Sequence, residues 1–400
     1  MSNTCTRIFL SPPSVGTAER TAVKRAFDSG YVAPCGPQVD EFERRLAVLS
    51  GRRYAVAVSS GTAAIDLLMD ELGVDESWTV VAPTLTFIAT VGPAFHRGAK
   101  LVFVDCDSTG NIDIDLLEQA LGAIKVDLAS DRADASTVAS QTLTICHALK
   151  DSNQTLKYPN SPLKGHKLLV VGVDLYGTCC DYGAISRLSR KYGAVFIDDA
   201  AEAVGATWNG KPAGSAGLAG VYSFNGNKIV TTSGGGAIVT DNRGVAERAK
   251  KRSQQSREKC AWYEHREVGY NYRLSNLLGS LGIAQLDRLP EILEKRRANF
   301  EWYLKHFKGD VLIPPEGANH WLTIGLLPSG RERDALSRRF ESANIESRPV
   351  WKPMHLQPVF RGCRVFGGEV AEALFERGIC LPSGTDLKSA DFRRIAGALG

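Results

Sequence analysis

The chain alternates between short apolar runs rich in β-branched residues and longer segments whose apolar residues recur at helical spacing. The apolar runs are typical of buried strands and occupy residues 78–83, 99–106, 167–175, 193–200, 220–225 and 235–241. The helical pattern occupies residues 38–50, 59–73, 113–124 and 182–193. Strands that alternate with helices form a mostly parallel sheet with helices on both faces. We therefore expect an α/β fold.

The pattern also predicts how the chain is divided. We expect residues 1–274 to form a large domain, interrupted by a polar insertion at about 125–165 with one short helix near 138–150. Residues 275–308 are expected to form a linking helical stretch, which Pro290 kinks or divides. The remainder, 309–400, is expected to be a smaller C-terminal α+β domain, with strands at 321–327 and 345–351 and a helix near 332–343.

Composition excludes several classes of protein. Lys and Arg total 48 against 44 for Asp and Glu, a net charge of +4 over 400 residues, so no nucleic-acid partner is expected. The nine cysteines are odd in number and form no CxxC, which predicts neither a disulfide framework nor a metal site. No apolar stretch approaches the ~18 residues of a membrane span, and no signal peptide is evident. We expect a cytoplasmic protein without a membrane partner.

One lysine stands in a segment suited to binding an anionic cofactor. Lys228 falls in a turn between two apolar strands, within VYSFNGNKIVTTSGGGAIVTD. Considered alone, it is best interpreted as a surface lysine, because a Schiff-base lysine needs a lowered pKa and an electron sink nearby. Ser223 and the glycine run 234–236 suit an anion site, where backbone N–H groups approach the ligand closely.

Three other segments have a functional and a structural interpretation each. Asp198 and Asp199 end an apolar strand, where carboxylates face the usual ligand crevice, or Asp199 caps a following helix. The segment SSGTAAIDLL (59–68) leads into a helix N-terminus, which binds phosphate through free N–H groups. Phe87, in APTLTFIAT, stacks on a flat cofactor or packs in the core, and the core is the default.

Together these segments resemble one family. The order S-G-T-A-A, T-F-x-A-T, D-D-A-A-E-A-x-G-A, S-F-x-x-x-K and G-Y-N-Y-R-L-S-N is similar to that of the DegT/DnrJ/EryC1/StrS sugar aminotransferases. The resemblance runs from about Phe9 to the C-terminus, apart from 125–165. It implies the aspartate aminotransferase fold (fold type I) and the cofactor pyridoxal 5′-phosphate (PLP).

The resemblance also implies a role for each matching residue. Lys228 would hold PLP as a Schiff base and then move a proton between substrate and cofactor. Asp199 would pair with the pyridine nitrogen and keep the ring an electron sink. Phe87 would stack on the ring. The phosphate would be held by Gly61, Thr62 and Ser223.

A further implied contact crosses a subunit interface. Asn271, in GYNYRLSN, would reach the cofactor phosphate of the neighbouring subunit. The resemblance therefore implies a homodimer with shared active sites.

Two departures from most of the family point to a narrower group. Glu202 stands where most members carry Gln, beside the cofactor's O3′, and SGGG (233–236) replaces a run that commonly contains Glu. Both features are shared with the UDP-sugar C4 aminotransferases of the bacillosamine pathway. Further segments similar to that group are 8–13, 29–34, 225–236, 348–355 and 378–385. The implied reaction moves the amino group of L-glutamate to C4 of a UDP-2-acetamido-2,6-dideoxy-4-keto-hexose, by ping-pong kinetics through pyridoxamine phosphate.

Candidate substrate residues follow from the same match. Arg348 would pair with the pyrophosphate, or is a surface arginine on a strand. Trp351 and His355 would contact uracil or sugar, or else pack the small domain. A loop over the site would contact the sugar through Gly30, Tyr31, Val32 and Ala33. Cys179 and Cys180 follow a loop that lies near the cofactor in the family, and buried inert thiols are the favoured interpretation.

Other functions remain to be separated from this one. A related enzyme would use the altrose-configured 4-keto sugar that leads to pseudaminic acid. PLP-dependent sugar dehydratases of the family replace the lysine with histidine, so Lys228 argues against that chemistry. A non-catalytic PLP-binding or sugar-binding regulator would release no 2-oxoglutarate from glutamate.

Overall fold

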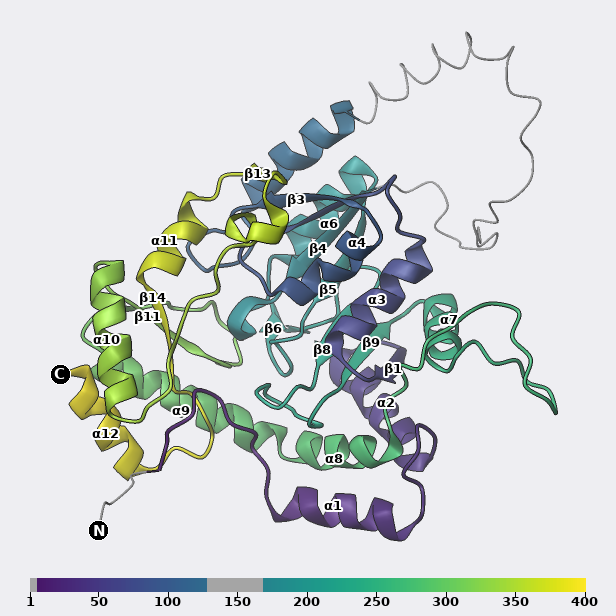
Figure 1. Ribbon diagram of the computed structural model, residues 1–400, viewed down its shortest axis with the longest axis horizontal. Helices are drawn as coiled ribbons and strands as arrows, with labels where there is room; N and C mark the ends of the chain where they lie inside the picture. Colours follow the sequence, from purple (N-terminus) through teal and green to yellow (C-terminus); the bar gives the residue numbers. More distant parts are fainter. Residues whose placement is uncertain (1–5, 128–167) are drawn as a thin grey trace.

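The computed structural model describes residues 6–127 and 168–400 (Figure 1). The polar insertion expected at about 125–165 therefore lies outside the described residues, apart from its first three positions. The short helix expected near 138–150 lies outside them entirely.

A mostly parallel sheet of eight strands forms the centre of the molecule. Its order is β1 (Tyr54–Val58), β9 (Gly236–Thr240), β8 (Gly220–Ser223), β5 (Val195–Asp199), β4 (Leu168–Val173), β2 (Thr79–Pro83), β3 (Lys100–Val104) and β13 (Arg364–Phe366). The pairs from β8 to β13 are parallel, whereas β9 runs antiparallel to both β1 and β8. The expected strands therefore form, in the expected kind of sheet.

Helices cover both faces of this sheet. The strands are buried on both sides because successive side chains point to opposite faces: Val80 packs in one core cluster and Val81 in the other. The first cluster includes side chains of α3 (Gly61–Leu72), α4 (Gly92–His96) and α7 (Arg243–Ser253). The second includes side chains of α2 (Pro37–Ser50), α6 (Tyr182–Tyr192) and a helix over 114–127. The α/β expectation is confirmed.

Two consecutive helices lead from the large sheet to the C-terminal part (Figure 1). α8 (Asn276–Asp287) begins after Ser275, whose hydroxyl accepts the Leu278 N–H. α9 (Leu289–His306) carries Pro290 in its first turn, where a missing N–H costs nothing. Pro290 therefore divides the stretch into two helices.

A second, antiparallel sheet lies at the C-terminal end of the molecule, in the order β10 (Asp310–Val311), β11 (Thr323–Leu326), β14 (Gly378–Leu381) and β12 (Arg348–Pro349). Its helices are α10 (Gly330–Ser342), α11 (Glu369–Arg377) and α12 (Ser389–Leu399). The other elements are α1 (Thr17–Asp28), β6 (Thr207–Trp208), β7 (Lys211–Pro212) and the 3₁₀ turns η1 (Ile88–Thr90), η2 (Leu175–Gly177), η3 (Met354–Leu356) and η4 (Pro358–Phe360). No helix among the described residues is long and apolar enough to span a membrane.

Two segments cross the domain limits expected from the sequence, and the division into three parts stays a prediction. β13 lies within 309–400 but pairs with β3 of the large sheet. Asp105, just after β3, accepts the N–H groups of Val370 and Ala371 at the start of α11, an anion at a helix N-terminus. At the other end of the chain, Ile8 forms a β-bridge with Ile345 and packs in the C-terminal core cluster.

Candidate active site

The candidate catalytic residues gather where parallel strands of the large sheet end. Asp199 is the last residue of β5 and Ser223 the last of β8. The segment Thr84–Thr90 follows β2, two strands away from β5. Ligands of α/β proteins bind at the carboxyl ends of parallel strands, so a ligand site is expected at this edge of the sheet.

Lys228 is not a solvated surface lysine. Its side chain is 13% exposed, and its Nζ lies 3.3 Å from Glu202 Oε1 and 4.0 Å from the centre of the Trp321 ring. The other Glu202 oxygen accepts the Tyr176 N–H at 2.8 Å. The lysine amine is therefore held between a carboxylate and an aromatic face.

Asp199 is a buried carboxylate aimed at the same region. Its Oδ2 accepts a hydrogen bond from Thr90 Oγ1 at 2.7 Å, and its Oδ1 accepts the Ala201 N–H at 3.2 Å. Burial raises the pKa of Asp199, while these hydrogen bonds and the charge of Lys228 lower it. No helix begins directly after β5, so the alternative that Asp199 caps a helix is wrong. Its chemistry fits a protonated ring nitrogen, whose positive charge would offset the cost of burial.

Phe87 lies three residues before Thr90 and is accessible. Its side chain is 59% exposed, so the alternative that it packs in the core is wrong. It immediately precedes η1, whose last residue is Thr90, the donor to Asp199. Thr90 is in turn bonded to Thr86 at 2.7 Å. The same short turn therefore carries Phe87 and the hydroxyl that orients the carboxylate.

A place for a phosphate lies at the start of α3. Ser60 caps this helix by accepting the Ala63 N–H, which leaves the N–H groups of Gly61 and Thr62 without a partner in the described part of the chain. The Ser223 hydroxyl also has none there. A Cβ at Gly61 would lie 3.2 Å from the Ser223 Cβ, so the two residues are adjacent. These donors fit the phosphate of PLP.

A cavity of about 490 Å³ lies next to the lysine turn. It is lined by Phe9, Leu10, Ser11, Pro12, Pro13, Asn227, Trp321, Leu322, Glu346, Arg348 and Trp351. Asn227 directly precedes Lys228, and the Trp321 ring faces its amine. Arg348 is exposed and lies 3.0 Å from Glu346. The structure therefore brings two predicted substrate residues, Arg348 and Trp351, to one cavity beside the lysine.

Other predicted site residues lie elsewhere on the chain, and their roles stay predictions. Both ring nitrogens of His355 are engaged, with Thr84 Oγ1 at 2.6 Å and Glu372 at 2.9 Å. Residues 30–33 form an exposed loop between α1 and α2, where Asn276 holds the carbonyls of Tyr31 and Ala33. Asn271 is exposed and pairs with Gln254 at the base of the segment that follows α7.

Three residues of the site escaped the sequence analysis: Thr90, Trp321 and Tyr176. Thr90 is the last residue of the T-F-x-A-T motif, so the sequence does contain a signal for it. Trp321 comes from a strand expected only to build the small domain. Tyr176 has a φ of +52°, an unusual conformation for a bulky residue, and its hydroxyl accepts the Trp351 N–H at 3.0 Å. The resemblance placed the loop 175–177, which contains Tyr176, near the cofactor, but no pattern in the sequence points to Trp321.

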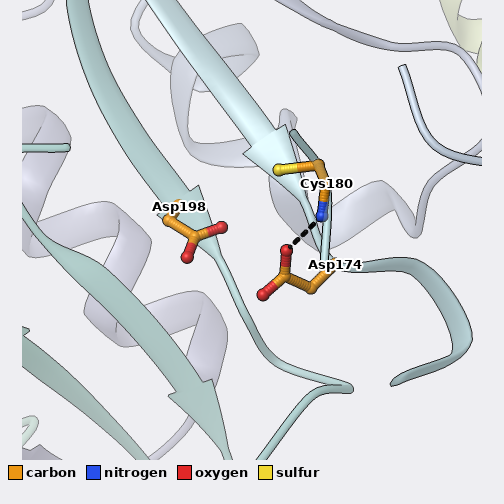
Figure 2. Close-up of side chains that lie close together, drawn as sticks. All are labelled: Asp174, Cys180 and Asp198. Atoms are coloured by element: carbon orange, nitrogen blue, oxygen red, sulfur yellow. Dashed lines mark hydrogen bonds between the residues drawn. The ribbon is translucent and has the colours of Figure 1, made fainter. Parts of the chain in front are cut away.

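Asp198, which directly precedes Asp199, forms a buried acidic pair with Asp174. The ligand atoms of Asp174, Cys180 and Asp198 lie within 4.8 Å of one another (Figure 2). Three of the four carboxylate oxygens already accept hydrogen bonds, from Cys180 N, Tyr182 OH and Gly214 N, and only Asp198 Oδ1 has no partner. Burial raises the pKa of Asp174 to about 7 and that of Asp198 well above its usual range. The pair therefore retains a proton near neutral pH.

The neighbouring thiols are buried as well. Burial raises the pKa of both Cys179 and Cys180. A thiol that stays protonated is a poor nucleophile and a poor metal ligand. These observations agree with the interpretation of Cys179 and Cys180 as inert thiols.

Comparison with known proteins identifies the family to which this geometry belongs. The model of the DegT/DnrJ/EryC1/StrS aminotransferase family matches residues 13–125 and 163–400. The putative pyridoxal phosphate-dependent aminotransferase EpsN of Bacillus subtilis is 38% identical over 97% of this chain and 94% of its own. A GDP-perosamine synthase of Caulobacter vibrioides is 31% identical over 98% of this chain and 97% of its own. A UDP-4-amino-4,6-dideoxy-N-acetyl-β-L-altrosamine transaminase of Campylobacter jejuni is 33% identical over 68% of this chain and 62% of its own.

Solved structures agree. The PLP form of the putative sugar aminotransferase Spr1654 from Streptococcus pneumoniae has a TM-score of 0.81 and 25% identity, covering 98% of both chains. DesI, with its TDP-sugar product, has a TM-score of 0.77 and 27% identity, covering 98% of this chain and 92% of its own. The central sheet is that of fold type I, and the protein is a PLP-dependent nucleotide-sugar aminotransferase. The chain belongs to the DegT/DnrJ/EryC1/StrS aminotransferase family.

Proposed function

We propose that the protein transfers the amino group of L-glutamate to C4 of a UDP-2-acetamido-2,6-dideoxy-4-keto-hexose, with Lys228 as the lysine that binds PLP. The observation that carries the proposal is the placement of Lys228. Its amine is paired with Glu202 and lies on the Trp321 ring beside a cavity of about 490 Å³. A largely buried lysine that is next to a substrate-sized cavity is suited to covalent work on a bound ligand.

The residues around Lys228 divide the chemical work. PLP, when bound, supplies an electron sink for the carbon that loses or gains a proton. Asp199 would hold the ring nitrogen in its protonated form, and the Thr90 hydroxyl orients that carboxylate. The Lys228 amine would move the proton, because it becomes a free base once the substrate amine has replaced it. Phe87 would cover one face of the ring, and the α3 N-terminus with Ser223 would bind the phosphate.

The cavity supports a nucleotide-linked acceptor. Arg348 offers a guanidinium for a diphosphate, and Trp351 and Trp321 offer aromatic faces for a base or a sugar. The UDP-linked 4-keto sugar is favoured by the Campylobacter relative that acts on a UDP-amino sugar and by Glu202 in place of Gln. The GDP-perosamine synthases support a second candidate, a GDP-linked 4-keto sugar.

We also propose a homodimer whose active sites are shared. The segment between α7 and α8 extends away from the body of the molecule (Figure 1) and carries Trp262 and Tyr263, which are 64% and 78% exposed. Exposed aromatic side chains on a projecting segment are typical of an interface between chains. Asn271 lies at the base of the same segment and is exposed, so a second subunit could contact it.

The test uses the visible absorbance of the purified protein with PLP, before and after L-glutamate is added without a sugar. We expect a band of the covalently bound cofactor that glutamate bleaches, with release of 2-oxoglutarate. A band that glutamate leaves unchanged would exclude glutamate as the donor. The second stage supplies UDP-linked and GDP-linked 4-keto sugars to the bleached enzyme. If only the GDP-linked sugar restored the band, the acceptor would be a GDP-linked 4-keto sugar and the proposed UDP-linked acceptor would be wrong.

A further inference from the structure

The turn that carries Lys228 is held by an unusual set of hydrogen bonds. The Asn227 carbonyl accepts two, from the Ser11 hydroxyl at 2.7 Å and from Trp321 Nε1 at 2.7 Å. Both donors are distant in sequence and nearly fully buried, with exposures of 7% and 1%. The carbonyl next to the lysine is therefore fixed by the N-terminal segment on one side and by the C-terminal domain on the other.

A buried arginine closes this set into a ring. Arg296 donates from Nη2 to Ser11 Oγ at 2.9 Å and from Nη1 to the Trp321 carbonyl at 2.9 Å and the Ser383 carbonyl at 2.7 Å. It forms no ion pair with a carboxylate of the described residues. Burial lowers its pKa to about 10, so it stays charged and a donor at neutral pH.

This charge decides how the Ser11 hydroxyl points. A guanidinium has only donors, so Ser11 Oγ must accept from Arg296. The single hydroxyl proton is then left for Asn227 O, and it cannot turn toward Arg296 without facing a donor. The direction of the Ser11–Asn227 bond is therefore fixed by a residue that does not touch the lysine turn.

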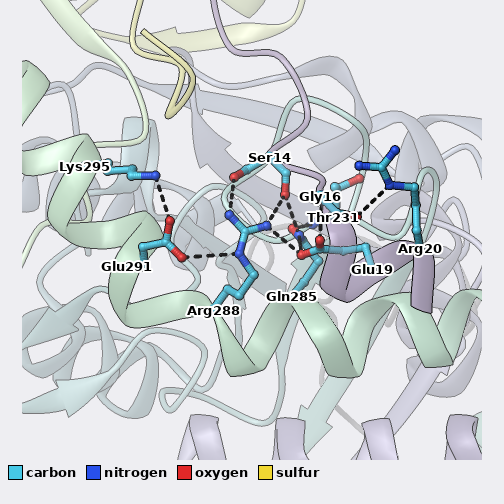
Figure 3. A network of polar contacts seen from close by, with 9 residues as sticks. All are labelled: Ser14, Gly16, Glu19, Arg20, Thr231, Gln285, Arg288, Glu291 and Lys295. Atoms are coloured by element: carbon cyan, nitrogen blue, oxygen red, sulfur yellow. Dashed lines mark hydrogen bonds and ion pairs between the residues drawn. The ribbon is translucent and has the colours of Figure 1, made fainter. Parts of the chain in front are cut away.

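The other end of the turn is tied to the same N-terminal segment (Figure 3). The Thr231 N–H donates to Gln285 Oε1 at 3.1 Å, and Gln285 Nε2 donates to the Ser14 carbonyl at 2.7 Å. Glu19 accepts from the same Gln285 nitrogen at 2.7 Å. Residues 11–14 thus hold the turn directly at Asn227 and through Gln285 at Thr231.

We propose that Ser11 is a positioning residue for Lys228: its hydroxyl, oriented by Arg296, fixes the Asn227 carbonyl and so sets where the lysine amine lies relative to Glu202 and Trp321. Trp321 makes the same contact from the other side while its ring faces the amine. The inference rests on the proposed role of Lys228 in binding the cofactor. Its consequence is that a residue near the start of the chain tunes cofactor binding without touching the cofactor.

The test compares Ser11→Ala with the wild-type enzyme. Loss of one oriented hydrogen bond predicts an increase of about tenfold in the dissociation constant of PLP and a comparable slowing of the glutamate half-reaction. The pH midpoint of the visible band of the bound cofactor should also move, because the amine shifts relative to Glu202. Ser50→Ala is the matched control: this serine is also buried, but its hydroxyl donates to Ala47 O within α2.

A second variant keeps the test decisive if Ser11→Ala is poorly folded. Trp321→Phe retains a ring but removes the Nε1 donor to the same carbonyl, so it should also shift the band midpoint and weaken PLP binding. Unchanged PLP affinity and band midpoint in folded Ser11→Ala would overturn the inference. If Ser11→Ala does not fold, the same result in Trp321→Phe would overturn it. Borohydride reduction of the wild-type holoenzyme with peptide mapping tests the proposed function separately. A label on a residue other than Lys228 would refute that role, whereas a label on Lys228 with no Ser11 effect would refute only the positioning.

Discussion

The buried pair Asp174 and Asp198 makes a quantitative prediction about stability against pH. The pKa of Asp174 is about 7 in the folded protein against 3.8 for the ordinary side chain. Between these values the folded chain keeps a proton that the unfolded chain has released. Stability from this group is therefore complete below about pH 4 and is lost as the pH rises through 7. A difference of about 3 units at about 1.4 kcal/mol each corresponds to about 4 kcal/mol.

Asp198→Asn should remove much of this dependence. The amide nitrogen can replace Oδ1, the one oxygen without a partner, while the remaining oxygen still accepts the Gly214 N–H. The variant also loses the Asp198 carboxyl group, whose pKa burial and the nearby charge of Asp174 raise well above its usual range. Relative to the wild type, the variant should gain stability as the pH rises from 5 to 7, by up to about 3 kcal/mol at about 1.4 kcal/mol for each pH unit, and the difference should level off toward pH 8.

The assay is urea unfolding of the PLP-free enzyme at pH 5, 6, 7 and 8, with the free energy of unfolding compared between variant and wild type at each pH. Asp28→Asn serves as the control, because Asp28 is an exposed carboxylate paired with Lys24. The difference in free energy of unfolding between Asp28→Asn and wild type should hardly change with pH. A difference between Asp198→Asn and wild type that stays constant from pH 5 to 8 would refute the shared proton.

Three further predictions test the proposed function. Lys228→Ala should lose the covalently bound cofactor and its visible band, and a wild-type band in this variant would show that another residue binds PLP. Arg348→Ala should raise the KM for the nucleotide sugar about tenfold by removing a charged contact to phosphate, while glutamate still bleaches the band at the normal rate; an unchanged KM would place the diphosphate elsewhere. Replacing Trp262 and Tyr263 with serine should weaken a dimer measured by sedimentation, and an unaltered mass would exclude this segment from the interface.

The sequence by itself determined the class of fold. A strand buried on both faces needs an unbroken apolar run, and the segments KLLVVGVDL and GAVFIDDA each contain one. The helix that starts after Ser60 and the break at Pro290 are likewise local, since a capping side chain and a missing N–H act within one turn. These features were predictable because their causes lie within a few residues of one another.

The site was predictable only in part. The family motifs pointed to Lys228, Asp199 and Phe87, and tertiary structure decided which interpretation of each is right. Lys228 alone favoured the surface, and burial against Glu202 and Trp321 reversed that interpretation. Phe87 alone favoured the core, and its exposed side chain showed that this interpretation is wrong.

Only the tertiary structure revealed how distant segments complete the site. Ser11, Arg296 and Trp321 belong to three segments with no common pattern, yet they close a ring of hydrogen bonds at Asn227. β13 shows the same limit, because its place beside β3 depends on α11 meeting Asp105. Periodicity records whether a residue faces a core, whereas the identity of its partner depends on how whole elements pack. The sequence therefore determined the sheet and the places where helices begin and break. Packing between distant elements decided the geometry around the lysine.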